Sequence, residues 1–413
     1  MTRPSTHVDA ARLWQSHLSL ARHGATAAGG VNRQALSDEE IAARRELIAA
    51  TRDLGLAAFT DAAGNFFLRM DGREADAPPV LTGSHIDSQP TGGRFDGAYG
   101  VLAGIEAIRA LRASGITPRR PIEVVAWMNE EGSRFAPGMM GSAAFAGAAE
   151  LSAFLTVTDA SGVSVGDELA RMQKAFRDVP LRPLGQPVAA YVEAHIEQGP
   201  LLEQEGFSVG VVTGIQGKRT FRVTVSGEEA HAGTTPLRGR RDALLAATAI
   251  IQGLSRAFTD PDDILKFTVG RIEVQPNAPS VVAARAVFSI DLRHPDSARL
   301  RSLGDDIAGL SIDYGRPCEV TVRELSCAMS LEFPQPIRDL IRGRATDIGI
   351  RTLDLPSAAG HDARFLHGVC PSGMIFVPCK GGISHNEAES ATASDLADGA
   401  RVLADVLLDL AGN

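Results

Sequence analysis

The chain has 413 residues, of which 44% are apolar and 22% charged, and its formal net charge is −9 with an isoelectric point near 5.6. This length exceeds what one hydrophobic core usually supports, so we expect two domains. The ordinary composition excludes wholesale disorder and a collagen-like fibre. The negative charge argues against a nucleic-acid or anionic-membrane partner, because its field repels phosphates.

The cysteines and the N-terminal segment indicate a reducing compartment. No C-x-x-C pair or short framework spacing is present, so we expect buried free thiols at Cys318, Cys327, Cys370 and Cys379. The N-terminal segment lacks the apolar core of a signal peptide, and no run approaches the roughly 20 apolar residues of a membrane span. We therefore expect a cytoplasmic protein.

The first half of the chain begins with a helical pattern and continues with alternating patterns. Ser37 to Glu40 form a capping box that opens a predicted helix running to Gly55, so we expect the N-terminal region to be helical. From Val80 to Val212, short apolar runs alternate with helical patterns. This alternation predicts an α/β fold with a mixed, largely parallel sheet.

The first polar motif follows the apolar pair Val80-Leu81 and reads GSHIDSQPTGGRFDG. It carries His85, Asp87 and Asp96, and such imidazole and carboxylate groups suit zinc, manganese or cobalt at catalytic sites. On an extended strand His85 and Asp87 point to the same face, which suits Asp87 as the acceptor that orients the imidazole.

An adjacent pair of acids, Glu130-Glu131, follows the apolar run at residues 121–128. Side chains at the carboxyl end of a buried strand lie where α/β folds place their active sites. Adjacent carboxylates face different neighbours, so one can hold a metal while the other moves a proton. An isolated pair of this kind is usually a solvated loop, but this pair is accompanied by other candidate ligands.

Two further histidines lie in strand-like segments near glycine: His195 in YVEAHIEQGP and His385 in CKGGISHNEAE. Together with His85, Asp96 and Glu131, they would give two divalent ions two terminal ligands each and one shared carboxylate, which is a sensible two-metal count.

The pattern changes after Gly214. Alternating strands and two helices follow in the order β-α-β-β-α-β, which predicts a small domain at residues 214–325 inserted into a discontinuous catalytic domain at residues 1–213 and 326–413. A helix near Leu396 to Leu410 closes the fold. The insertion carries candidate substrate contacts at His231, Asn277 and Arg293, although Arg293 would also suit an ordinary surface position and His231 a helix entry before Pro236.

Motifs of other enzyme classes are missing. Gly217-Lys218 is followed by Arg219, and Val212 stands where a P-loop needs glycine. The chain contains no G-x-G-x-x-G at the start of a βαβ unit and no H-E-x-x-H. Water activated by metal ions is the remaining strong option for catalysis.

The ordered motifs resemble those of the hydantoinase/carbamoylase branch of the M20-type dinuclear metallohydrolases, which includes N-carbamoyl-L-amino-acid hydrolases, β-ureidopropionases and allantoate amidohydrolases. The likeness covers nearly the whole chain. It rests on GSHIDSQPTGGRFDG, MNEEGSRFAPGMMGS, AHIEQGP, AHAGTTP, DLRHP, AAGHDA and GGISHNE, in that order.

The resemblance implies a role for each matching residue. It makes Asp96 the bridging ligand of two zinc, manganese, cobalt or nickel ions, and Glu130 the general base; the other ligands are His85, Glu131, His195 and His385. It also implies that Asp87 orients His85. The expected reaction is hydrolysis of the ureido bond, releasing ammonia, carbon dioxide and the amino acid.

The resemblance also makes the insertion a lid and dimerisation domain. His231 would then reach the partner subunit's site of a homodimer and stabilise the oxyanion. Arg293 and Asn277 would bind the carboxylate of a small ureido substrate. The residues implied to line the cleft are Gln198, Gly360 and His361.

The substrate stays open at this stage. Ala358 stands where the family commonly has glycine, and its methyl group either narrows the pocket or fits an allowed backbone conformation. An allantoate amidohydrolase, an aminoacylase or a peptidase would use the same metals and Glu130. A non-catalytic ligand-binding relative is the alternative of another class, and Glu130 argues against it because binding alone needs no proton carrier.

Overall fold

The computed structural model describes residues 3–412, and the chain divides into two compact units. The main unit comprises Met1–Thr213 and Phe333–Asn413, and the inserted unit comprises Gly214–Glu332. The boundary expected at residue 325 falls inside a strand, β13 (Glu319–Ala328). The inserted unit therefore extends beyond the end of β13 and ends at Glu332.

The main unit is built on a nine-stranded mixed sheet in the order β1-β2-β4-β3-β5-β16-β6-β14, with β15 paired to β6. Its four central strands β4, β3, β5 and β16 run parallel to one another, whereas the flanking pairs in β1-β2-β4 and β16-β6-β14 are antiparallel. The strands are β1 (Ala57–Thr60), β2 (Phe66–Met70), β3 (Val80–His85), β4 (Ile122–Trp127), β5 (Ala190–Ile196), β6 (Val209–Ile215), β14 (Leu331–Glu332), β15 (Thr352–Ser357) and β16 (Ser372–Val377).

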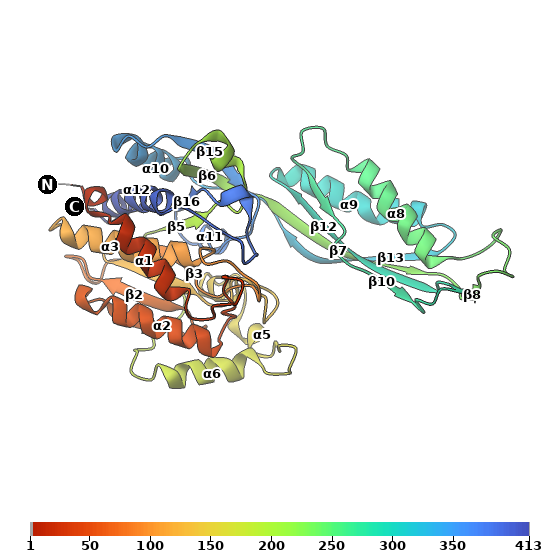
Figure 1. Ribbon diagram of the computed structural model, residues 1–413, viewed down its shortest axis with the longest axis horizontal. Coiled ribbons are helices and arrows are strands. Elements are labelled where there is room, and N and C mark those ends of the chain that lie inside the picture. Colours follow the sequence, from red (N-terminus) through yellow and green to blue (C-terminus); the bar gives the residue numbers. More distant parts are fainter. Residues whose placement is uncertain (1–2, 413) are drawn as a thin grey trace. The chain divides into compact units, whose positions relative to one another are not determined.

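Every residue of the four central strands is buried, because helices cover both faces of a parallel sheet. This confirms the strands expected from the apolar runs. Figure 1 shows α1, α3 and α12 side by side, and their apolar residues join the main core. The helices are α1 (Ala10–Leu20), α2 (Asp38–Ala50), α3 (Ala98–Ala113), α4 (Met140–Phe145), α5 (Leu151–Leu155), α6 (Val165–Ala175), α7 (Leu201–Glu205), α10 (Gln335–Asp347), α11 (Ala363–Leu366) and α12 (Ala393–Ala411), with short 3-10 turns η1 (Pro4–His7), η2 (Arg52–Leu54) and η3 (Lys380–Gly382).

The N-terminal region contains the expected helices, and two strands that were not expected follow them. Ser37 caps α2 by accepting the backbone N–H of Glu40, as the capping box predicts, but α2 ends at Ala50. The η2 turn follows, and Gly55 ends it in the left-handed conformation with φ 62°. The strands β1 and β2 then extend the sheet, because the apolar run at residues 66–70 pairs with β4.

The inserted unit has the expected β-α-β-β-α-β order, with short extra strands. Its sheet follows the order β10-β12-β7-β13, with β9 paired to β12, and its helices α8 and α9 pack on this sheet (Figure 1). The elements are β7 (Gly217–Ser226), β8 (Ala230–His231), α8 (Ala243–Ala257), β9 (Lys266–Thr268), β10 (Ile272–Gln275), β11 (Val281–Val282), β12 (Arg285–His294), α9 (Ser297–Tyr314) and β13 (Glu319–Ala328). The helix entry considered for His231 is wrong, since Asp242 caps the next helix.

The cysteines agree only partly with expectation. Cys318, Cys370 and Cys379 are buried free thiols, whereas Cys327 is free but exposed because it lies near the end of β13 at the edge of its sheet. No helix within residues 3–412 is long and apolar enough to cross a membrane.

Candidate metal centre

The predicted ligands of the main unit come from segments at one edge of the parallel sheet. His85 is the last residue of β3, His195 lies near the end of β5, and Asp96 precedes Gly97, the N-cap residue of α3. Glu131 follows β4, and His385 follows η3 after β16. Since these strands are parallel, their carboxyl ends meet at the same edge and bring the side chains together.

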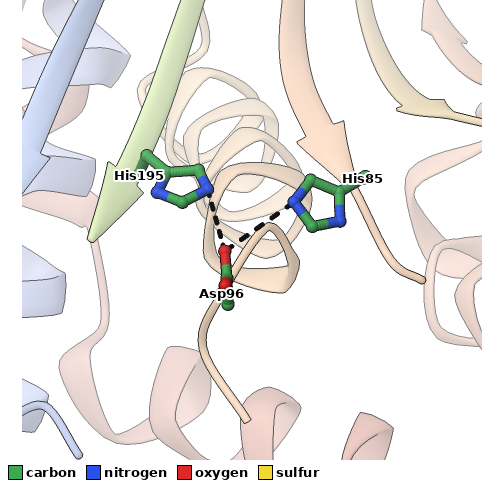
Figure 2. A group of neighbouring side chains, drawn as sticks. All are labelled: His85, Asp96 and His195. Atoms are coloured by element: carbon green, nitrogen blue, oxygen red, sulfur yellow. Dashed lines mark ion pairs between the residues drawn. The ribbon is translucent and has the colours of Figure 1, made fainter. Parts of the chain in front are cut away.

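Asp96 Oδ1 forms the first group of candidate ligand atoms with two histidines, as Figure 2 shows. It lies 3.2 Å from Nε2 of His195 and 3.8 Å from Nε2 of His85. All three residues are buried. We call this group, His85, His195 and Asp96 Oδ1, the inner half-site.

Asp96 Oδ2 faces a second group. It lies 3.2 Å from Nε2 of His385, and the same nitrogen lies 3.3 Å from Oε2 of Glu131. We call this group, Glu131, His385 and Asp96 Oδ2, the outer half-site. The two oxygens of one carboxylate therefore serve two separate groups, which is the arrangement of a bridging ligand.

The histidine hydrogen bonds test whether a cation fits the inner half-site. Nδ1 of His85 lies 2.9 Å from the carbonyl oxygen of Asp87, and Nδ1 of His195 lies 2.8 Å from that of Ile196. A carbonyl oxygen accepts a hydrogen bond from Nδ1–H, so a neutral imidazole here keeps its lone pair on Nε2. Each lone pair then lies near Asp96, and that of His195 also accepts the backbone N–H of Gly97 at 3.3 Å. A cation between the lone pairs and the carboxylate would bind both. The donor set fits a divalent metal.

Space and charge at this edge are tightly constrained. Gly97 has φ 64°, and a Cβ there would lie 2.3 Å from Nε2 of His85, so no larger residue fits. Burial opposes the ionised form of Asp96, but whenever His195 and His385 carry a proton on Nε2, their hydrogen bonds hold the pKa of Asp96 well below the usual value. Burial of Glu131 raises its pKa to about 7, and a nearby cation would favour the charged form of this carboxylate at neutral pH.

Glu130 lies beside the inner half-site, with Oε2 3.6 Å from Nε2 of His85. Burial raises its pKa well above the usual value; His85 opposes this shift, whereas Asp362 and Glu131 add to it. A carboxyl group with a raised pKa next to candidate metal ligands has the properties of a proton carrier.

Asp87 makes different contacts from those expected. The strand β3 ends at His85, and the closest contact of the imidazole is to the backbone carbonyl of Asp87, whereas the nearest carboxylate oxygen is 3.6 Å away. The carboxylate instead accepts the backbone N–H groups of Glu130 and Glu131, each at 3.2 Å. Asp87 therefore joins the loop after β3 to the pair of acids after β4.

Gln198 and His361 also lie at this edge. Gln198 donates from Nε2 to Asp96 Oδ2 at 3.0 Å. The ring centroid of His361 is 4.5 Å from that of His195, and His361 forms a further candidate group with His195 and Glu193. Gly360 is exposed, and a Cβ on it would lie 3.3 Å from Cε of Met139, so this glycine borders a tightly packed side chain.

Three polar residues that support the candidate ligands, Gln89, Ser384 and Glu389, were not expected from the sequence. Gln89 donates from Nε2 to Oε2 of Glu131 at 2.7 Å. Ser384 donates to Asp96 Oδ2 at 3.1 Å or to Glu389 at 3.0 Å. Each lies inside a motif quoted above, so proximity to a ligand in sequence was the available signal, but their hydrogen bonds depend on loop conformation.

The remaining expected site residues belong to the inserted unit. His231 is exposed, and its Nδ1 accepts the backbone N–H groups of Gly233 at 3.0 Å and Thr234 at 3.1 Å, so a neutral ring carries its proton on Nε2. Asn277 is exposed and has φ 58°.

Arg293 also lies in the inserted unit, on the polar face of β12. It binds Asp291 through Nε at 2.8 Å and Nη2 at 3.2 Å, and Lys218 binds the same carboxylate at 3.1 Å. This pairing fixes the plane of the guanidinium fork.

Comparison with known proteins identifies similar chains. A model of peptidase family M20/M25/M40 matches residues 81–409. The chain is 39% identical to the N-carbamoyl-L-amino-acid amidohydrolase of Rhizobium meliloti, covering 98% of this chain and 97% of that one. It is 36% identical to the allantoate amidohydrolase of Escherichia coli, covering 95% and 96%. A solved amidase of the hydantoinase/carbamoylase family from Burkholderia multivorans matches with a TM-score of 0.88 at 44% identity, covering 98% and 99%.

Proposed function

Since the chain belongs to peptidase family M20/M25/M40, in its hydantoinase/carbamoylase branch, and is an amidohydrolase of ureido C–N bonds, we propose that its substrate is an N-carbamoyl-L-amino acid. The observation that carries this proposal is Glu130 next to a full set of metal ligands, together with relatives named for this activity. Retention of a proton carrier favours an enzyme over a ligand-binding relative.

The proposed mechanism uses two divalent ions held by the inner and outer half-sites. Bound there, they would activate a water molecule and polarise the ureido carbonyl. Glu130 takes the proton released by the water and returns it to the departing amino-acid nitrogen as the C–N bond breaks. The products are the free amino acid and a carbamate, which breaks down to carbon dioxide and ammonia.

A substrate panel tests the proposal. Purified protein loaded with zinc, manganese, cobalt or nickel is assayed for ammonia with N-carbamoyl-L-amino acids, β-ureidopropionate and allantoate, and for free amino acid with N-acetyl amino acids. We expect the highest kcat/KM for an N-carbamoyl-L-amino acid. A preference for allantoate would favour the second candidate, which the Escherichia coli relative supports. Cleavage of N-acetyl amino acids alone would contradict the proposal.

We also propose that Arg293 binds the substrate carboxylate. The Arg293→Ala protein should have a KM raised by about 10- to 100-fold with kcat little changed, because a charge-assisted hydrogen bond contributes about 1.5–3 kcal/mol. Steady-state kinetics with a carboxylated substrate and its methyl ester measure the effect, which should be small for the ester.

Arg271→Ala is the matched control for Arg293→Ala. Arg271 also binds an acid two residues away, Glu273, at 2.9 Å, but it directly precedes β10 and lies outside the expected site. Unchanged kinetics for both variants would remove Arg293 from the substrate site.

The homodimer and the role of His231 in the partner subunit's site are further parts of the proposal. Its Nε2–H is suited to donate to a developing oxyanion, and such a donor contributes about 2.7–4 kcal/mol to catalysis. His231→Ala should therefore reduce kcat by about 10²- to 10³-fold.

A mixing experiment separates action in trans from action in cis. Inactive Glu130→Gln and His231→Ala subunits are combined, unfolded and refolded together. In trans, one site of each mixed dimer has both Glu130 and the partner's intact His231, so activity returns. No recovery in verified mixed dimers would show that His231 does not act across the interface.

The identity of the ion and the cytoplasmic location stay predictions. Histidine and carboxylate ligands accept zinc, manganese, cobalt and nickel, so the ligand set does not select one of them. Elemental analysis of protein purified from its own host identifies the native ion, and fractionation of the same cells tests the location.

A further inference from the structure

The two half-sites are held in different ways. In the inner half-site, the side chains of His85 and His195 are 3% and 1% exposed, and backbone carbonyls fix both rings through Nδ1. In the outer half-site, the side chain of His385 is 50% exposed. The outer half-site therefore depends on other contacts to hold its geometry.

Glu389 provides such a contact, because it joins the bridging acid to the loop that carries His385. Its Oε1 accepts the backbone N–H groups of Phe95 at 2.8 Å and Asp96 at 3.1 Å. Its Oε2 accepts the hydroxyl of Ser384, the residue before His385, at 3.0 Å. One carboxylate thus fixes the backbone at Asp96 and the adjacent loop at the same time.

The surroundings of Glu389 leave its carboxylate little freedom. The residue is 4% exposed, and a Cβ added at Gly93 would lie 2.0 Å from its Oε1, so the carboxylate fills the space that glycine leaves open. His385 has φ 53°, a conformation that L-residues rarely adopt without support from their surroundings. The loop is closed by a hydrogen bond from the N–H of Glu389 to the carbonyl of Asn386 at 3.0 Å.

We propose that Glu389 is a positioning residue that sets the affinity of the outer half-site for its metal ion, and that this ion is the more easily lost of the two. The inference rests on the two-ion centre proposed above. Glu389 acts without touching the ion, by holding Asp96 and the His385 loop in register. Supporting residues of this kind typically change metal affinity by about 10- to 100-fold.

Metal titration of the full-length protein tests this role. Metal-free wild type and Glu389→Ala are titrated with Co²⁺, which is followed by its visible absorption, and the bound ions are counted after dialysis against graded chelator. Wild type should bind two ions with different affinities. In Glu389→Ala the weaker affinity should fall by about 10- to 100-fold while the tighter one stays unchanged.

Glu389→Gln distinguishes positioning from charge. The glutamine oxygen can still accept the N–H groups of Phe95 and Asp96, and its amide can donate to Ser384 while Ser384 donates to Asp96. We therefore expect this variant to bind its second ion nearly as wild type does. Loss of affinity as large as in Glu389→Ala would overturn the positioning role, because it would mean that only the charge matters.

Asp260→Ala is the matched control, since the Asp260 carboxylate also accepts two backbone N–H groups, from Ile264 at 2.9 Å and Leu265 at 2.7 Å, in the inserted unit and outside the metal loops. It should bind both ions normally. If Glu389→Ala loses affinity for both ions equally, or loses affinity for neither, the inference is overturned. Absence of metal binding in wild type would instead contradict the proposed function.

Discussion

A Glu130→Gln protein is expected to keep its metal ions and to lose nearly all of its turnover. The side chain is 11% exposed and its Oε2 lies 3.6 Å from Nε2 of His85, so glutamine fits the same space. An amide cannot accept the proton of water or deliver it to the leaving nitrogen. General acid–base catalysis contributes about 10²- to 10⁴-fold, and kcat should fall by that factor. Ammonia release measures turnover, and elemental analysis measures metal content.

The neighbouring variant Glu131→Gln is the contrast that assigns different roles to the two acids. Glu131 belongs to the outer half-site and accepts a hydrogen bond from Gln89 at 2.7 Å. Its replacement should weaken the binding of one ion and so lower the metal content. Glu130→Gln should leave the metal content unchanged. Substantial residual turnover in fully metal-loaded Glu130→Gln would remove Glu130 from the role of general base.

The central sheet could be predicted because its strands are buried on both faces. The runs that became β3, β4 and β16 are apolar and bounded by turns, so their type followed from composition and length. The order of the strands in the sheet could not be predicted from composition and length. Two distant segments that pair carry no mark of that pairing in the hydrophobic pattern of either segment. The strands β1 and β2 were missed for the same reason, since β2 becomes part of the sheet only by pairing with β4.

The proximity of the candidate ligands could be predicted because parallel strands bring their carboxyl ends together. A polar residue at the end of an apolar run, as at His85 or His195, already has a defined place in such a sheet. No comparable rule predicts the contacts that support the ligands. Gln198 and His385 adopt positive φ angles of 56° and 53°, and the hydrogen bonds of Glu389 arise from two loops far apart in sequence. Loop conformation of this kind is set by tertiary contacts.

Asp96→Asn is expected to have the other large effect, the loss of both metal ions and of activity. Asp96 Oδ1 faces His85 and His195, while Oδ2 faces His385. An asparagine offers one neutral oxygen, and its amide nitrogen donates hydrogen bonds and cannot bind a cation. One half-site therefore loses a ligand atom, and both lose the negative charge that lies between two cations.

The ion count makes this prediction specific. Elemental analysis after dialysis should find two ions per chain in wild type, one in Glu131→Gln and fewer than one in Asp96→Asn, because only Asp96 belongs to both half-sites. Metal ions supply several kcal/mol of transition-state stabilisation, so kcat/KM for Asp96→Asn should fall by about 10³-fold or more. If Asp96→Asn keeps two ions, the carboxylate does not bridge, and each half-site must then bind its ion through ligands of its own.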